Sequence, residues 1–326
     1  MSSENRHYFE EFLYLCDLFG SCIGRTQGAG GNISVKWDNK LLVKASGYRL
    51  SAVNENEGYV YCNIDRVKSC YDNQEENLES AILEKTQSKP SMESFFHLLP
   101  KQYIVHIHST FFCKYLCKSN TANIFSEENF PRSLFIPYIK PGLKLAQSIL
   151  PNYSDQSLIF LENHGIILLG NSIEQIVDLY DKTVRHAESI WKEPSTYSSL
   201  IVEKKLKDLT KQTVKPVYNL SFSLPSFFLP VTPDHFLFLQ DSPLQVKESQ
   251  LESSLLEWKD KKQTFPSVLQ IDSQIYILGK SYIQCQNKEE YLRSYFEIYD
   301  HASFLPKENL DELMSCSKET FRIHKE

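Results

Sequence analysis

The feature that most limits the fold of this chain is a set of short, mostly apolar runs bounded by turn residues. Residues 103–108, 158–161 and 166–169 form three such runs, and Asn163-His164-Gly165 separates the last two. Short apolar runs flanked by turn residues are typical of buried strands. The sequence therefore predicts one buried strand at 103–108 and two strands joined by a turn at residues 163–165.

Two longer segments have the periodicity of helices that bury one face. Apolar side chains recur at three- and four-residue intervals between residues 4 and 20, and again between 173 and 191. After the first of them, the glycine-rich residues 28–32 lead into two further strand-like runs, 33–37 and 41–44. This alternation of helices and strands predicts an α/β fold.

Composition divides the chain into two lobes. After Pro194 the sequence becomes rich in Ser, Lys and Thr as far as about Val217. We therefore predict a first domain at 1–195, a linker at 196–216 and a second, smaller α/β lobe at 217–326.

The end of the second lobe repeats an order found in the first. Residues 166–172 and 275–281 each contain a strand-like run, then Gly and Ser, and a helical pattern follows both. We interpret the second lobe as a degenerate internal repeat. Ser273 then occupies the place of His164, so this lobe is expected to be structural or to shape the substrate site, without a metal ligand at that position.

Charge and composition exclude several classes of protein. A net charge of −6 without a dense cluster of Lys and Arg argues against a nucleic-acid partner. The apolar runs are far shorter than the roughly 20 residues of a membrane-spanning helix, and the N-terminal residues do not resemble a secretory signal. Eight cysteines without a Cys-x-x-Cys pair indicate free thiols. We therefore expect a cytoplasmic protein that does not bind membranes.

Three histidines are candidate metal ligands. His106 and His108 are two residues apart on a predicted strand, so their side chains project from the same face. His164 lies at a tight turn beside Gly165 and is a plausible third ligand. Zinc commonly takes three protein ligands and leaves one position open. The competing interpretation is that these imidazoles only form hydrogen bonds in a core, which is the interpretation we give to His7, His97, His186, His235 and His301.

The glycine-rich loop at 28–31 has two interpretations. Glycines allow backbone N–H groups to approach an anion closely, and the side chains of Asn32 and Ser34 could complete such a cradle. An ordinary hairpin loop would have the same composition. The loop matches neither the phosphate loop of nucleotide hydrolases nor the dinucleotide fingerprint Gly-x-Gly-x-x-Gly.

Five motifs in order resemble the class II aldolase/adducin family. They are residues 27–34 (Gln-Gly-Ala-Gly-Gly-Asn-Ile-Ser), 44–47 (Lys-Ala-Ser-Gly), 90–93 (Pro-Ser-Met-Glu), 106–109 (His-Ile-His-Ser) and 163–165 (Asn-His-Gly). Within that family, residues 89–109 look most like the aldolase part of bifunctional rhamnulose-phosphate aldolase/dehydrogenase proteins. The resemblance implies a three-layer α/β/α lobe around a largely antiparallel sheet, and a homo-oligomer.

The resemblance also implies roles for particular residues. His106, His108 and His164 would bind Zn²⁺ or another divalent metal, and Glu93 would be the catalytic acid/base. The pocket for a substrate phosphate would be lined by Asn32, Ser46, Gly47 and Ser91. One departure from the family pattern concerns this pocket, because Met92 stands where the best-known sugar-phosphate aldolases have a second serine.

The function implied is zinc-dependent aldol cleavage of a ketose phosphate or related hydroxy-ketone through a metal-stabilised enediolate. The same chemistry serves epimerases, dehydratases and decarboxylases of the superfamily, so these reactions remain alternatives. A non-catalytic, adducin-like binding protein is a third interpretation. The presence of all three histidines and Glu93 argues against it, because a scaffold does not need those side chains.

Overall fold

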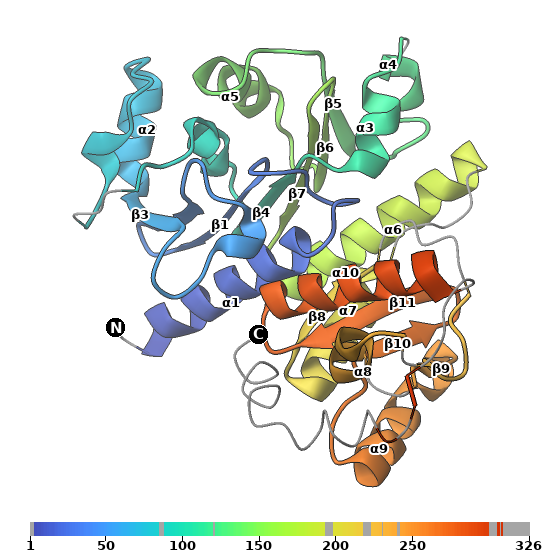
Figure 1. Cartoon of the computed structure of the whole chain (residues 1–326). Coiled ribbons are helices and arrows are strands. Elements are labelled where there is room, and N and C mark those ends of the chain that lie inside the picture. Colours follow the sequence, from blue (N-terminus) through green and yellow to red (C-terminus); the bar gives the residue numbers. More distant parts are fainter. Residues whose placement is uncertain are drawn as a thin grey trace. The chain divides into compact units, whose positions relative to one another are not determined.

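The fold comes from a computed structural model that describes residues 3–84, 88–119, 121–192, 198–217, 223–229, 231–239, 242–299, 305–306 and 308. The chain divides into two compact units, Met1–Ser195 and Thr196–Glu326, which are described separately. Figure 1 gives the positions of the helices and strands along the chain.

The first unit is built on a seven-stranded sheet with the order β3-β2-β1-β4-β7-β6-β5. Neighbouring strands are antiparallel except β5 and β6, which are parallel. The α/β class and the largely antiparallel sheet are thus confirmed, as are the strands expected at 33–37, 41–44, 103–108, 158–161 and 166–169. The strands are β1 (Asn32–Trp37), β2 (Lys40–Lys44), β3 (Tyr59–Asn63), β4 (Tyr103–Ile107), β5 (Ser133–Ile136), β6 (Leu158–Leu161) and β7 (Gly165–Gly170).

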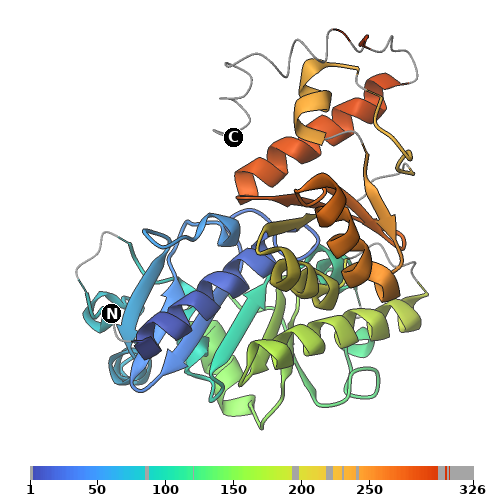
Figure 2. The ribbon, with the colours of Figure 1, turned by 90° about the horizontal axis from the view of Figure 1, so that it is seen from below.

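Helices cover both faces of this sheet and give the three layers that were expected. Figure 1 shows α2 and α5 on one side, with α1 and α6 on the other, and Figure 2 shows α1 and α6 together over the sheet. The 3₁₀ helix η3 (Met92–Leu98) packs on the side of α2 and α5 through Phe95 and Phe96. The helices are α1 (Ser3–Gly20), α2 (Ile64–Asp72), α3 (Thr110–Leu116), α4 (Thr121–Ile124), α5 (Leu143–Ile149) and α6 (Ile173–Trp191).

The second unit is a smaller three-layer assembly around a four-stranded sheet with the order β8-β11-β10-β9. Helices α8 and α10 pack on one face of the sheet, and α7 and α9 pack on the other. The predicted linker at 196–216 is wrong, because residues 200–216 form α7 and the edge strand of this sheet. The elements are α7 (Leu200–Thr210), β8 (Thr213–Pro216), α8 (Pro233–Leu239), β9 (Leu244–Val246), α9 (Leu251–Lys262), β10 (Val268–Ile271), β11 (Gln274–Gly279) and α10 (Tyr282–Ile298).

The second unit repeats half of the first, as the sequence suggested. The order β8-β11-β10-β9 matches β4-β7-β6-β5, and in each set only the last two strands are parallel. The register matches too, because His106 pairs with Ile167 just as Pro216 pairs with Tyr276. Local contacts recur: the backbone N–H of Asn171 donates to Gln175, and that of Lys280 donates to Gln284. The degenerate repeat therefore extends to the order, direction and register of the strands.

The second unit has other residues at two positions that match candidate metal ligands of the first unit. Pro216 takes the place of His106 on the strand, and Ser273 takes the place of His164 in the turn. Lys211-Gln212 precede β8 as Lys101-Gln102 precede β4, and counting back from these pairs places Glu203 where the first unit has Glu93. Glu203 is fully buried and accepts a hydrogen bond from Ser198 at 2.6 Å.

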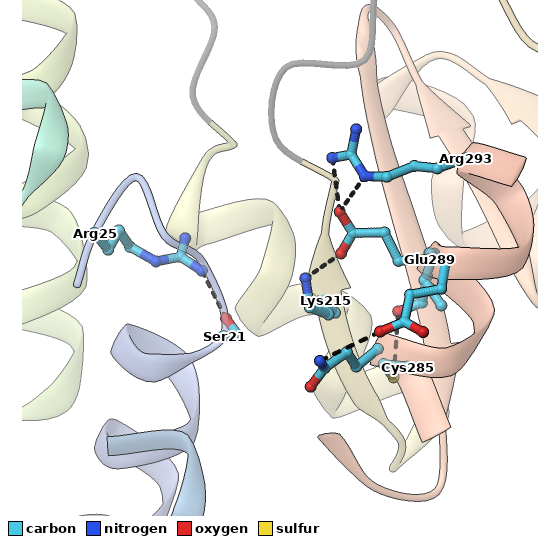
Figure 3. Close-up of polar contacts among 9 residues, drawn as sticks. Ser21, Arg25, Lys215, Cys285, Glu289 and Arg293 are labelled. Atoms are coloured by element: carbon cyan, nitrogen blue, oxygen red, sulfur yellow. Dashed lines mark hydrogen bonds and ion pairs between the residues drawn. The ribbon is translucent and has the colours of Figure 1, made fainter. Parts of the chain in front are cut away.

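Ion pairs join the elements of the second unit. Glu289 on α10 accepts hydrogen bonds from Arg293 at 2.7 Å and from Lys215 on β8 (Figure 3). In the first unit, Figure 3 shows the buried Arg25, which donates to Ser21 at 2.7 Å.

Seven cysteines fall within the described residues and all are free thiols. None of the helices described is long and apolar enough to cross a membrane.

Candidate metal centre

Strand pairing brings the three candidate ligands of the first unit to one end of the sheet. His106 is near the end of β4, His108 follows the strand directly, and His164 lies in the turn between β6 and β7. Because β4 pairs with β7 in antiparallel register, the end of β4 lies beside the start of β7. Asn163 adopts a positive φ of 53°, which allows this turn to place His164 there.

Four side chains converge at this end. The ligand atoms of Glu93, His106, His108 and His164 all lie within 4.8 Å of one another. The Nε2 atoms of His106 and His108 are 3.0 Å apart, and the ring centroids of the three imidazoles are separated by 4.8 to 4.9 Å. Three imidazoles and one carboxylate form a donor set suited to a divalent transition metal such as zinc.

A backbone hydrogen bond orients the imidazole of His106. Its Nδ1 lies 3.0 Å from the carbonyl oxygen of Ile166, to which a neutral imidazole donates its N–H. The tautomer set by this bond leaves Nε2 unprotonated, with its lone pair toward the other ligands. Burial also lowers the pKa of His106, so the ring is held in the neutral form that a metal requires.

Glu93 reaches the cluster from the 3₁₀ helix η3. The hydroxyl of Ser91 caps this helix by accepting the backbone N–H of Glu93 at 3.2 Å. The carboxylate lies 3.1 Å from His164 Nε2 and 3.6 Å from His106 Nε2. Burial opposes ionisation of Glu93, but the three histidines together outweigh it and hold its pKa below the ordinary value. Glu93 is therefore a carboxylate at neutral pH.

The glycine-rich loop leaves room for the imidazole of His108. A Cβ atom on Gly30 would lie 2.4 Å from Nδ1 of His108, which is closer than any real contact. Gly165 is equally restricted, because a Cβ there would lie 2.3 Å from the carbonyl oxygen of Ile107. Neither interpretation of residues 28–31, an anion cradle or an ordinary hairpin loop, included the requirement that position 30 has no side chain.

We expect Gly30→Ala to weaken metal binding by about 10- to 100-fold, the cost typical of disturbing a ligand's supporting contacts. The added methyl group would displace the His108 ring. Gly28→Ala is the matched control, because a Cβ there meets nothing within 4 Å, although its φ of +54° adds strain of about 1 kcal/mol. Competition with a zinc-sensitive dye measures both affinities. Equal affinity of the two variants would contradict the steric role of Gly30.

Asn32 lies beside the cluster with an available amide. It pairs directly with His106 across β1 and β4, so both side chains are on the same face of the sheet. Its side chain is fully buried, and neither its amide oxygen nor its amide nitrogen has a hydrogen-bond partner. A buried amide without partners costs free energy unless a ligand or water satisfies it. This observation supports the expected contact of Asn32 with substrate.

The other three residues expected to bind substrate lie on adjoining segments. An isolated bridge joins Ala45 to Pro90, and the N–H of Ser46 donates to the carbonyl of Lys89 at 2.8 Å, so the Ser46-Gly47 turn runs beside Ser91. Gly47 adopts a φ of +82° and is exposed. Ser91 has a structural task as well, because its hydroxyl caps η3.

Lys44 was not among the site residues expected from the sequence, although it belongs to one of the five motifs. Its buried ammonium donates to the backbone carbonyls of Ala29 at 3.3 Å and Tyr48 at 2.6 Å, and so ties the glycine-rich loop to the Ser46-Gly47 turn. Burial lowers the pKa of Lys44, and the carboxylate of Glu93 partly offsets this effect. Lysines are rarely buried without partners, but nothing in the sequence shows that Lys44 is buried.

The remaining histidines of the described residues lie outside the cluster. His97 is fully buried, and its Nδ1 is 2.6 Å from the hydroxyl of Ser34. His186 is hydrogen bonded to the carbonyl of Asn129 at 2.7 Å, and His235 to Ser294 at 3.0 Å. His7 lies 3.5 Å from Glu11. These contacts agree with packing or hydrogen-bonding roles, while His301 lies outside the described residues.

We expect the metal-free protein to lose stability as the pH falls below about 6.5. Burial lowers the pKa of His97 to about 3 and that of His108 to about 4, whereas both rings titrate near 6.5 when unfolded. The unfolded chain therefore binds more protons in this range, and each ring removes about 1.4 kcal/mol per pH unit from the free energy of unfolding. Urea unfolding of chelator-treated protein at pH 7, 6 and 5 measures the slope, which His97→Gln should reduce. A flat profile would contradict burial of these neutral rings.

Comparison with known proteins agrees with this geometry. The profile of the family described as class II aldolase and adducin N-terminal domain matches residues 10–190, which is more than half of the chain. The chain therefore belongs to the class II aldolase and adducin family, as its motifs suggested. The candidate metal centre lies entirely within the matched region.

Individual relatives match about half of this chain. An L-fuculose phosphate aldolase of Methanococcus maripaludis is 28% identical, covering 48% of this chain and 79% of the relative. An uncharacterized oxidoreductase of Bacillus subtilis, YuxG, is 24% identical to this chain. The match covers 54% of this chain but only 28% of the length of that relative. The N-terminal class II aldolase domain of a Thermoplasma acidophilum protein matches 56% of this chain and 92% of that domain, with a TM-score of 0.50 and 23% identity. This last likeness concerns the fold.

Proposed function

We propose that the chain is a metal-dependent carbon–carbon lyase, with zinc as the preferred ion, that cleaves a ketose phosphate or related hydroxy-ketone in the retro-aldol direction. The observation that carries the proposal is the convergence of three imidazoles and one carboxylate at the end of β4. Family membership and the fuculose phosphate aldolase relative support the same reaction class.

His106, His108 and His164 would hold the ion. The set fits, because His106 presents an unprotonated Nε2 and the four ligand atoms already lie within 4.8 Å of one another. When bound, the ion supplies a Lewis acid that polarises the substrate's carbonyl and stabilises the negative charge developing on it. Imidazole donors bring no negative charge to the ion, so among the four side chains only the carboxylate of Glu93 would offset its positive charge.

Glu93 would move the proton. Its carboxylate takes the proton of the hydroxyl on the carbon that becomes the aldehyde, and the bond between that carbon and its neighbour breaks. The electron pair of the broken bond passes into the carbonyl and gives an enediolate, and Glu93 then returns the proton to its carbon. Glu93 lies 3.1 Å from His164, which supports this role, because its carboxylate would lie close to a substrate bound at the cluster.

Asn32, Ser46, Gly47 and Ser91 would bind the substrate. The unsatisfied amide of Asn32 can pair with a substrate hydroxyl or phosphate oxygen, and the exposed Ser46-Gly47 turn offers a hydroxyl and backbone N–H groups. Met92 cannot supply a second hydroxyl beside Ser91. Its side chain is 60% exposed, so it is also available to contact the organic part of a substrate.

Product analysis tests the reaction class. L-fuculose 1-phosphate and other ketose 1-phosphates are incubated with the zinc-loaded protein, and the products are separated by mass spectrometry. We expect an aldehyde and a three-carbon ketone phosphate in equal amounts. An isomer of the same mass, loss of water or release of carbon dioxide would overturn the lyase in favour of an epimerase, dehydratase or decarboxylase. No turnover by a metal-loaded protein on a broad panel would favour an adducin-like binding protein.

A further inference from the structure

The second unit contains a cavity that the metal centre does not use. Its volume is about 410 Å³, and it lies at the end of the sheet where β8 begins and β11 ends. Pro216 and Ser273, which match His106 and His164, lie at the opposite ends of these strands. The cavity therefore does not lie where the second unit matches the candidate metal centre of the first. Cavities of about 300 to 1,000 Å³ suit small molecules.

The charges around this cavity have one sign. Lys259, Lys280 and Lys288 line it, and none of its described lining residues carries a carboxylate. The polar lining is completed by amides and hydroxyls, and part of the wall is apolar. The polar members are Gln212, Gln263, Gln284, Thr264 and Ser267, and the main apolar members are Leu237, Phe238 and Phe265.

Two of the three lysines are held by contacts on the cavity wall. The ammonium of Lys288 donates to the hydroxyl of Ser267 at 3.0 Å and to the carbonyl of Leu278 at 2.7 Å. The ammonium of Lys259 lies 4.8 Å from the ring centre of Phe265. Burial lowers the pKa of Lys288 to about 8, Cys285 opposes this shift, and the exposed Lys280 lowers the pKa further. The two ammonium groups repel each other, and a bound anion would relieve the repulsion.

The helix α10 adds to the positive potential. It is 17 residues long, begins after Ser281 and has no acidic residue in its first turn. Gly279, Lys280 and Gln284 at this end of the helix belong to the cavity lining. The N-terminal end of a helix carries a partial positive charge that favours anions.

Two of the three lysines have no counterpart at the matching positions of the first unit. The framework here is shared by both units, since Lys280 and Gln284 repeat the contact of Asn171 with Gln175. Counting along the matching helices from Ser172 and Ser281 places Leu179 opposite Lys288. The first unit thus has an amide and an apolar side chain where the second unit has two ammonium groups.

We propose that this cavity binds a small phosphorylated metabolite, with Lys259, Lys280 and Lys288 around the phosphate and the apolar wall against the organic part. Three ammonium groups complement the two negative charges of a phosphomonoester, and lysine is a common phosphate ligand. The site would be additional to the metal centre, because its lining residues all belong to the second unit.

Calorimetric titration of the full-length, metal-loaded chain with glycerol 1-phosphate and with inorganic phosphate tests the site. We expect Lys280→Gln and Lys280→Gln/Lys288→Gln to weaken binding by about tenfold or more, as the loss of charge-assisted hydrogen bonds implies. Lys247→Gln is the matched control, since it removes an exposed charge from the same unit outside the cavity. Because Lys280 is exposed, its single variant tests the site even if Lys288→Gln disturbs the fold.

A second readout locates the ligand. Lysine acetylation by a water-soluble reagent, followed by peptide mass spectrometry, should be slowed by glycerol 1-phosphate at Lys280 and unchanged at Lys247. Equal affinity of wild type and both cavity variants would overturn the proposal. So would binding that is lost in Asn32→Ala and retained in Lys280→Gln, because that pattern assigns the phosphate to the first unit alone.

Discussion

Glu93→Gln is expected to lower kcat by about 10²- to 10⁴-fold while the chain keeps its metal, because general acid–base groups contribute about that much. The amide has nearly the shape of the carboxylate and leaves all three imidazoles in place. It cannot accept a proton at neutral pH, however, so bond cleavage loses its base. The measurement is steady-state turnover of the substrate identified by product analysis, together with metal content per chain.

Glu79→Gln is the control for this substitution. It makes the same chemical change in the same unit, at an exposed carboxylate that pairs with Lys89. Its turnover should equal that of wild type. If Glu93→Gln were as active as Glu79→Gln, the acid/base role would be withdrawn, whereas a metal-free Glu93→Gln would mean that this side chain is chiefly a ligand.

His106→Ala is expected to lose both metal and activity. The substitution removes a nitrogen donor from the centre of the cluster and leaves the carbonyl of Ile166 without its imidazole partner. We expect metal affinity to fall by more than about 100-fold, since disturbing even an outer hydrogen-bond partner of a ligand costs about 10- to 100-fold. Turnover should fall to the detection limit.

Thermal unfolding gives an independent readout for this variant. Zinc stabilises a protein that binds it only when folded, by about 4 kcal/mol at 1,000 times the dissociation constant. Added zinc should therefore raise the Tm of wild type and of His186→Ala, in which a histidine outside the cluster is removed, but not that of His106→Ala. A zinc-dependent rise in His106→Ala equal to that of wild type would show that the ion binds elsewhere.

The sequence predicted five of the seven strands of the first sheet, but not β3 or β5, and it identified the candidate ligands that converge at the end of β4. Side chains two residues apart on a strand lie on the same face, so His106 and His108 share a face regardless of the rest of the fold. The position of His164 depends on the pairing of β4 with β7, which spacing alone does not determine. There the family resemblance supplied the missing long-range information.

Other features depended on packing that has no local signal. Residues 200–216 have a composition typical of a linker, yet Leu206 and Val214 are buried in a core of the second unit, so tertiary contacts decided their structure. The roles of Gly30 and Lys44 follow from a close approach of segments far apart in the chain. The repeat was visible only at its end, while the matching strand registers showed how far it extends.

The most direct test of the metal centre is the metal content per chain of protein purified without chelator, measured by plasma mass spectrometry. About one zinc or other divalent ion per chain is expected for one site of three imidazoles. This ion should be absent from His106→Ala. No bound metal in wild type, even after incubation with zinc, would contradict the metal centre and with it the proposed lyase chemistry.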